Sequence, residues 1–400
     1  MHIETTLVIL FSVATAAAIA ARWAKIPYTA VLVIAGIILG ALHVVSPPRL
    51  THQLLFAVIL PGLLFEAAFN INVGIFLKNK IAITALAIPG VIAAIFLAGT
   101  GAALGISTLS PHTGFTLQQG LVFGALVAAT DPIAVVAIFR ELHVPARLAT
   151  LVEGESLLND GTSIVLLSLL LAAVTGATSG LGPLALQFVL IVGGGVFLGF
   201  VAGTMASKLI SKIDDAVIEI TITVITAYGT FAIAEQVGVS GVIATVVAGM
   251  YCGEYGWTEG MSSKTRLALD AFWEYMAFAL NSVVFLLIGF EVSAPTLLGA
   301  WPEILLAYVV VVVARAAVVY GVGALLRRSK ERIPAKWLSV MTWGGLRGAL
   351  SMVLALALPF EFPNRELLIT LTFGVVLISI LLQGLTMQML LRTTGLTSKA

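Results

Sequence analysis

Charged residues are scarce in this chain of 400 amino acids. Asp, Glu, Lys and Arg make up 10% of the chain, whereas 60% of it is hydrophobic. Soluble domains usually carry about 25% charged residues, so these are too few to cover a water-soluble surface. The scarcity excludes the two or three soluble domains that the length would suggest. The net charge is only +1, which gives no reason to expect a nucleic acid partner.

Cysteine is almost absent as well. The single Cys252 excludes an internal disulfide and a cysteine-based metal cluster. The N-terminus lacks the basic leader that is typical of a signal peptide. It has Glu4 before its apolar run and Arg22 and Lys25 after it, so we expect a retained first membrane span.

Long apolar runs are abundant. Many are close to the roughly 20 residues that a helix needs to cross a bilayer core, whereas a transmembrane barrel shows alternating segments of about ten residues. We therefore predict an all-α polytopic membrane protein with thirteen transmembrane helices, the ninth of them short. The expected spans are 4–21, 27–46, 52–70, 81–108, 119–140, 147–174, 183–207, 216–235, 240–253, 270–292, 302–326, 336–358 and 367–391.

The basic residues at the span ends and in the loops predict an orientation. Seventeen of them fall on one side of the membrane, and only Arg49 and Arg365 fall on the other. Lys and Arg are enriched in cytoplasmic loops, so we expect the N-terminus outside and the C-terminus in the cytoplasm. We expect one transmembrane domain over residues 1–400 and no soluble regulatory domain.

The odd number of spans predicts two inverted six-helix repeats, spans 1–6 and 8–13, in which spans 5 and 12 correspond. Pro132 interrupts span 5 in ATDPIAVV, and Gly344, Gly345 and Gly348 loosen span 12 in TWGGLRGALSM. Secondary transporters bind their substrates near the membrane midplane beside such interrupted helices.

Six charged residues are clearly intramembrane once the loops have been assigned. Each costs a few kcal/mol or more at the bilayer centre unless it is paired or faces a cavity, so we expect them to form a site. They are Glu66, Asp131, Glu155, Asp160, Arg315 and Arg347.

In span 6, Ser156, Asn159, Asp160 and Ser163 follow the i, i+3, i+4, i+7 spacing of one helical face. The alternative for Glu155 is that it caps the helix start near the membrane surface. This alternative is weakest for Asp160, which lies deep in the span and is the strongest candidate for a binding group.

The other candidates leave alternatives open. Asp131 and Pro132 could simply mark a turn, but in lipid a helix break survives only where it lines protein or water. The carbonyls freed beside Thr130 suit a hard monovalent cation. Glu66 could be a ligand, a helix-packing acid or the partner of an arginine. Arg315 is too deep to reach the interface easily, so we expect it to pair with a carboxylate.

Five motifs carry a resemblance to a known family along nearly the whole chain. They are LPGLLFEAAFN (60–70), ATDPIAVVAIF (129–139), EGESLLNDGTSIV (153–165), FALNSVVFLLIGFEV (278–292) and GGLRGALSM (344–352). Together they resemble the monovalent cation/proton antiporter family, which includes NhaP-type exchangers of bacteria and the sodium/proton exchangers of animals and plants.

The resemblance implies roles for the candidate residues. Asp160 is implied to bind either the cation or a proton, and Asn159 before it resembles the electroneutral branch. The implied cation shell is completed by Asp131, the Thr130 backbone, Ser156 and Glu66.

Two arginines also match the family. The resemblance implies a structural ion pair between Glu155 and Arg315, and it identifies Arg347 as the arginine of the second broken helix. The sequence leaves open whether Arg347 is instead the partner of Glu155. The resemblance further implies a homodimer. In each protomer a core domain (spans 3–6 and 10–13) moves against a dimerisation domain (spans 1–2 and 7–9), with spans 5 and 12 crossing.

The sequence therefore predicts a secondary antiporter that exchanges Na⁺ or Li⁺ for H⁺ by alternating access, with cation and proton competing for Asp160. The expected partners are the transported cation, membrane lipid and a second copy of this chain. We expect the protein in a bacterial or archaeal plasma membrane, with no cofactor and no catalytic residue. Potassium/proton exchange is the main alternative. A channel is disfavoured because no charged rings are evident, and an intramembrane hydrolase because catalytic motifs are missing.

Overall fold

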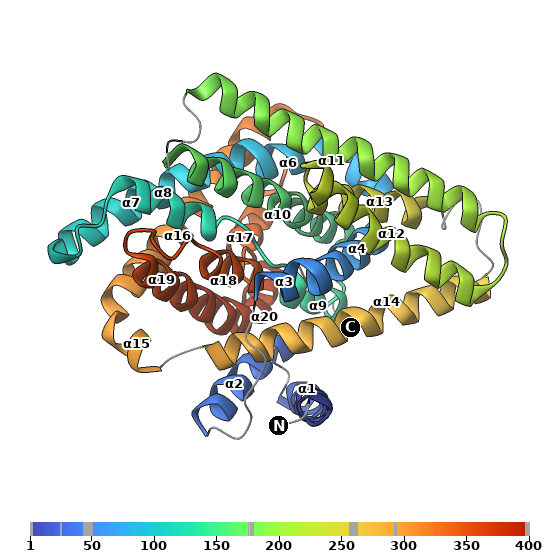
Figure 1. Ribbon diagram of the computed structural model, residues 1–400, viewed down its shortest axis with the longest axis horizontal. Helices are drawn as coiled ribbons and strands as arrows, with labels where there is room; N and C mark the ends of the chain where they lie inside the picture. The colour runs from blue at the N-terminus through green and yellow to red at the C-terminus, as the bar shows by residue number, and fades with distance from the viewer. Residues whose placement is uncertain are drawn as a thin grey trace. The chain divides into compact units, whose positions relative to one another are not determined.

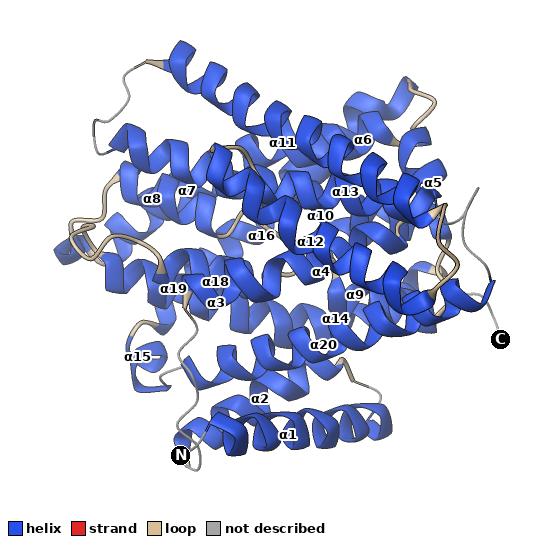
Figure 2. Cartoon of the chain, turned by 45° about the vertical axis from the view of Figure 1, so that its right-hand side comes forward, coloured by secondary structure: helices blue, strands red, loops and turns tan. Residues whose placement is uncertain are grey.

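In the computed structural model the regular secondary structure of the described residues is all helical, and none of these residues lies in a β-strand (Figure 2). It describes residues 3–24, 26–42, 51–174, 176, 180–255, 263–291 and 294–396. The end of the predicted second span (43–46) lies outside these ranges, as do Lys25, Arg49 and Lys399 of the charge count. The predicted all-α fold is confirmed.

Eight of the predicted spans are occupied by continuous helices. Seven helical stretches in the described part of the chain are long and apolar enough to cross a membrane, and α13 is short, as expected for span 9. The continuous helices are α1 (Ile3–Ala24), α2 (Tyr28–Ala41), α10 (Ala146–Val174), α11 (Leu181–Ile210), α12 (Ala216–Val237), α13 (Gly241–Tyr255), α14 (Ser263–Glu291) and α16 (Trp301–Leu325).

Three further spans contain a turn of π-helix, which is a local widening that often occurs at functional sites. In the last of them, this turn carries Ser379. The three segmented spans are α3–η1–α4 (His52–Leu54, Leu55–Ile59, Leu60–Asn70), α6–η2–α7 (Lys80–Ala85, Leu86–Gly90, Val91–Leu109) and α19–η6–α20 (Arg365–Ile378, Ser379–Gln383, Gly384–Thr394).

The remaining two spans are broken in the middle. Predicted span 5 consists of α8 (Leu117–Leu126) and α9 (Ile133–Glu141), and predicted span 12 consists of α17 (Ala335–Trp343) and α18 (Ala349–Leu356) (Figure 1). Four short elements connect spans: η3 (Pro111–Thr113), α5 (Val73–Lys78), α15 (Ala294–Gly299) and η5 (Leu326–Arg328). Both predicted interruptions are confirmed, whereas the inverted repeat stays a prediction.

Contacts divide the chain into two units. The first unit contains residues 1–52, 79–159 and 282–400, and the second contains residues 53–78 and 160–281. The predicted core and dimerisation domains are defined by which helices move together. A division by contacts within one conformation does not test this, so these domains stay a prediction.

The second unit has an aromatic core. Trp273 is fully buried, its ring centroid lies 4.9 Å from that of Phe65, and its Nε1 donates to Thr223 Oγ1 at 3.1 Å. Cys252 lies in the same cluster as a free, buried thiol. The cluster holds α4, α12, α13 and α14 together.

Candidate functional site

The two broken spans meet inside the first unit. Asp131 N, in the break between α8 and α9, donates to Leu346 O, in the break between α17 and α18, at 2.8 Å. The proline and glycines that interrupt the helices explain the breaks, since Pro132 has no N–H to donate. A backbone amide freed by one break is therefore satisfied by a carbonyl freed by the other.

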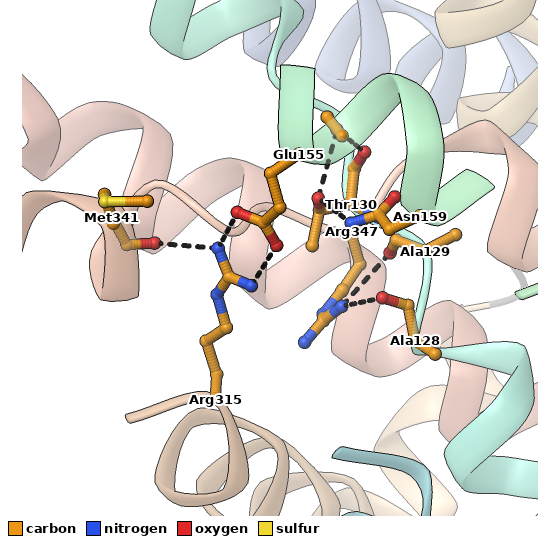
Figure 3. A network of polar contacts seen from close by, with 9 residues as sticks. Ala128, Ala129, Thr130, Glu155, Asn159, Arg315, Met341 and Arg347 are labelled. Atoms are coloured by element: carbon orange, nitrogen blue, oxygen red, sulfur yellow. Dashed lines mark hydrogen bonds and ion pairs between the residues drawn. The ribbon is translucent and has the colours of Figure 1, made fainter. Parts of the chain in front are cut away.

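Arg347 occupies the crossing. Its Nη1 donates to Ala128 O at 2.8 Å and to Ala129 O at 3.1 Å (Figure 3). These carbonyls lie just past the end of α8, where a helix presents its negative pole. The side chain is only 4% exposed, so its charge is compensated by carbonyl dipoles. The sequence placed Arg347 in the second broken helix but had no signal for these backbone partners.

One face of α10 holds the first break in place. Asn159 Nδ2 donates to Thr130 Oγ1 at 2.7 Å (Figure 3). Ser156 Oγ donates to Thr130 O. All three residues are buried. The i, i+3 pair predicted for span 6 thus positions the non-helical backbone at Thr130 in the structure.

Glu155 and Arg315 form a buried ion pair in the first unit. The guanidinium contacts both carboxylate oxygens, with Nη2 to Oε2 at 2.7 Å, and Nη2 also donates to Met341 O at 3.2 Å. Glu155 is 1% exposed and Arg315 is 8% exposed. Bidentate pairs of this kind are strong and directional. The arginine that pairs with Glu155 is therefore Arg315, while Arg347 binds carbonyls.

Asp131 lies at the start of α9 in the same crossing. Its Oδ1 accepts from Ile133 N at 3.0 Å, and the residue is half-buried. Gly348 packs directly against it: a Cβ on Gly348 would lie 2.8 Å from Asp131 Cγ and closer still to Oδ2. The glycine is needed here because the carboxylate occupies the space of its missing side chain.

This close approach gives a testable expectation. Gly348→Ala should reduce transport at least about tenfold, because the methyl group forces the Asp131 carboxylate out of position, and a small misplacement of a functional group is costly. Gly321→Ala in α16 is the matched control, since a Cβ there meets nothing within 4 Å. Exchange rates in vesicles, normalised to protein content, measure the effect. Equal rates for the two variants would refute it.

The remaining candidate carboxylates lie in the second unit. Asp160 directly follows Asn159 on α10 and is half-buried. Glu66 on α4 is also half-buried and accepts from Asn70 Nδ2 at 2.8 Å. Within the described ranges, no group of three or more His, Cys, Asp or Glu side chains is arranged to hold a metal ion. The cation-binding roles of Asp160, Asp131, Glu66, Ser156, Thr130 and Asn159 stay predictions.

Sequence reasoning missed several groups at the crossing. The carbonyls of Ala128, Ala129 and Met341 have no sequence signal, because every residue carries a carbonyl. Ser379 Oγ accepts from Arg347 N at 3.1 Å. It had a usable signal, since it is a polar residue within the apolar run of the last span.

Comparisons with known proteins agree with this architecture. Residues 8–393 match the family model described as "Sodium/hydrogen exchanger, transmembrane". The chain is 39% identical over 400 residues to the Na⁺/H⁺ antiporter ApNhaP of Aphanothece halophytica, covering 99% of this chain and 75% of that protein. It is 37% identical over 347 residues to the Na⁺/H⁺ antiporter NhaP of Pseudomonas aeruginosa, covering 85% of this chain and 81% of that protein.

A solved structure shares the fold. The sodium proton antiporter MjNhaP1 from Methanocaldococcus jannaschii superposes with a TM-score of 0.79 at 20% identity, covering 98% of this chain and 97% of that chain. The polytopic helical membrane fold is therefore confirmed. The family match spans nearly the whole chain, including both broken helices and the Asn159–Asp160 pair. The chain belongs to the sodium/hydrogen exchanger family of membrane-spanning monovalent cation/proton antiporters.

Proposed function

We propose that this protein exchanges Na⁺, or Li⁺, for H⁺ across a membrane by alternating access. One observation carries the proposal: two broken helices cross in the first unit, Ser156 and Asn159 of α10 hold the break at Thr130, and the Asp131 carboxylate lies at the crossing. A crossing of this kind provides freed carbonyls next to a carboxylate, which is the chemistry that binds a hard monovalent cation. The relatives named as Na⁺/H⁺ antiporters support sodium as the cation.

In this proposal Asp160 carries the exchanged charge. Its carboxylate binds either the cation or a proton, so each displaces the other. Asp131, Glu66 and the backbone at Thr130 complete the cation shell, while Ser156 and Asn159 hold that backbone in its non-helical conformation. The core domain then exposes this site to each side in turn, moving against the dimerisation domain of a homodimer.

The proposed orientation follows the basic residues, with the N-terminus outside and the C-terminus in the cytoplasm. The proposed location is the plasma membrane of a bacterium or archaeon, with lipid as the surrounding partner. Potassium/proton exchange on the same fold is the competing function, because sodium and potassium are bound by the same oxygen ligands.

The deciding experiment uses everted membrane vesicles whose lumen has been acidified and a dye whose fluorescence is quenched by the pH gradient. Adding Na⁺ or Li⁺ should release protons and restore fluorescence, whereas K⁺ should have little effect. A response to K⁺ alone would make the protein a potassium/proton antiporter. No response to any of the three cations would refute cation/proton exchange.

A single shared site predicts how the sodium response depends on pH. Protons occupy Asp160 as pH falls, so the sodium concentration for half-maximal exchange should rise, approaching about tenfold per pH unit at the acidic end by mass action. The maximal rate at saturating sodium should change much less. Titrating sodium in the dye assay at several pH values measures both quantities. A half-maximal concentration that is independent of pH would indicate separate sites.

A one-for-one exchange moves no net charge. Asn159 supports this stoichiometry because it places a neutral amide next to Asp160, and that amide is committed to Thr130. We expect an imposed membrane potential, set with a potassium gradient and valinomycin in proteoliposomes, to leave the sodium-driven proton flux unchanged within about twofold. A flux that accelerates steeply with potential would show that more than one proton moves per sodium.

A further inference from the structure

A small cavity in the first unit is lined by both Arg315 and Arg347. It is formed by α16, the break between α17 and α18, α19 and η6. Its lining includes Tyr308, Arg315, Thr342, Gly345, Arg347 and Ser379. Its volume is about 10 Å³, and a cavity needs roughly 10–15 Å³ to hold one water molecule. The cavity therefore fits a single occupant of water size.

Four of the lining residues have polar atoms without a hydrogen-bond partner among the described residues. They are Arg315 Nε, Arg347 Nε, Thr342 Oγ1 and Tyr308 Oη. Each of these residues is more than nine-tenths buried. Leaving a buried polar group without a hydrogen-bond partner lowers the stability of the fold, and more so when the group is charged. Four such atoms around one cavity indicate a common partner.

The charge around the cavity determines what that partner is. Arg315 and Arg347 bring two positive charges, and Glu155 brings one negative charge that is already committed to Arg315. Guanidinium nitrogens can only donate hydrogen bonds. The occupant must therefore accept hydrogen bonds, which excludes a second cation site.

Gly345 keeps this cavity accessible to the guanidinium. A Cβ at this position would lie 2.8 Å from Arg315 Nε, so any other residue would cover the unpartnered atom. The absence of a side chain leaves that edge of Arg315 open to a ligand.

We infer that one ordered water molecule occupies this cavity and accepts hydrogen bonds from both guanidinium groups. Four polar partners match the two to four that a buried water requires, and chloride is larger than the space. The water links the Glu155–Arg315 pair on α10 and α16 to Arg347, which binds the carbonyls at the end of α8. It is a positioning element that joins the two arginines of the helix crossing. This inference does not depend on which cation the protein exchanges.

The test is a cryo-EM map of the full chain in lipid nanodiscs at a resolution that shows water, about 2.2 Å. We expect one isolated density peak within about 2.7–3.2 Å of the Nε atoms of both arginines. The peak should be the same in chloride and in gluconate buffer. No peak, or a peak that is lost when chloride is replaced, would overturn the assignment to water.

Matched variants connect the density to the lining residues. Thr342→Val removes one hydroxyl at nearly constant shape and should weaken or abolish the peak, whereas Thr342→Ser should retain it. Gly345→Ala should expel the water and lower the thermal midpoint by several degrees, relative to Gly321→Ala. If Gly345→Ala does not fold, the Thr342 pair still decides the question. Full-strength density in Thr342→Val and in Gly345→Ala would contradict the proposed hydrogen bonds.

Discussion

Asp160→Asn is expected to reduce sodium-driven proton release to the background of vesicles that lack the protein. The substitution keeps the size of the side chain and removes the only group that we propose to exchange a proton for a cation. An amide neither carries a negative charge nor takes up a proton near neutral pH. Because asparagine matches aspartate in size and Asp160 is only half-buried, the fold should be retained.

Asp215→Asn is the matched control for this substitution. Asp215 caps α12, where its Oδ1 accepts from Val217 N at 2.9 Å and from Ile218 N at 3.0 Å. Asparagine caps helices as well as aspartate does, and the residue is exposed, so exchange should be normal. Both variants are measured in the dye assay after their membrane content has been equalised. Normal exchange in Asp160→Asn would refute the assignment of the shared site.

Breaking the ion pair between Glu155 and Arg315 is expected to have the largest effect on stability. Arg315→Met leaves a buried carboxylate without its guanidinium, and removing one partner of a buried pair costs about 3–5 kcal/mol. The cost is high because Glu155 is 1% exposed and water cannot replace the lost contact. Thermal and denaturant unfolding of the purified protein in detergent measure the loss.

A more exposed pair between α9 and α10 serves as a control. Arg140 lies 3.9 Å from Glu153, and the arginine side chain is 67% exposed. Exposed pairs contribute about 0–1 kcal/mol, so Arg140→Met should change stability little. The double variant Glu155→Gln/Arg315→Met should be more stable than Arg315→Met alone, because no unpaired charge remains. If Arg315→Met and Arg140→Met lower the free energy of unfolding equally, the buried pair does not stabilise the fold more than the exposed pair, and the prediction is wrong.

Sequence reasoning reached much of the fold because its signals are local. Continuous apolar runs identify spans wherever the surrounding medium is lipid. Pro132 and the glycines at 344, 345 and 348 mark breaks because proline lacks a donor and glycine weakens a helix. The spacing of Ser156 and Asn159 placed them on one face of α10 for the same local reason.

Other features depend on residues that are far apart in the chain. Glu155 and Arg315 are separated by 160 positions. Their positions within apolar spans made it reasonable to expect a partner for each of them. Only the family resemblance indicated that they would pair with each other. Asp131 N bonding to Leu346 O, and Arg347 bonding to Ala128 O, involve backbone carbonyls. A carbonyl is common to every residue, so no sequence pattern distinguishes these from the others.

The amino-acid sequence by itself determined the helical membrane fold, the positions of both interruptions and the polar residues that had to be compensated inside the membrane. These follow from the cost of placing charge and unsatisfied backbone in lipid. The family resemblance implied that the interruptions cross and that Glu155 pairs with Arg315. Only the tertiary structure decided which backbone atoms join the two interruptions, that Arg347 binds carbonyls, and that Gly348 leaves room for Asp131. The reason is that these contacts depend on how distant helices pack, and each side chain takes the partner that packing brings within reach.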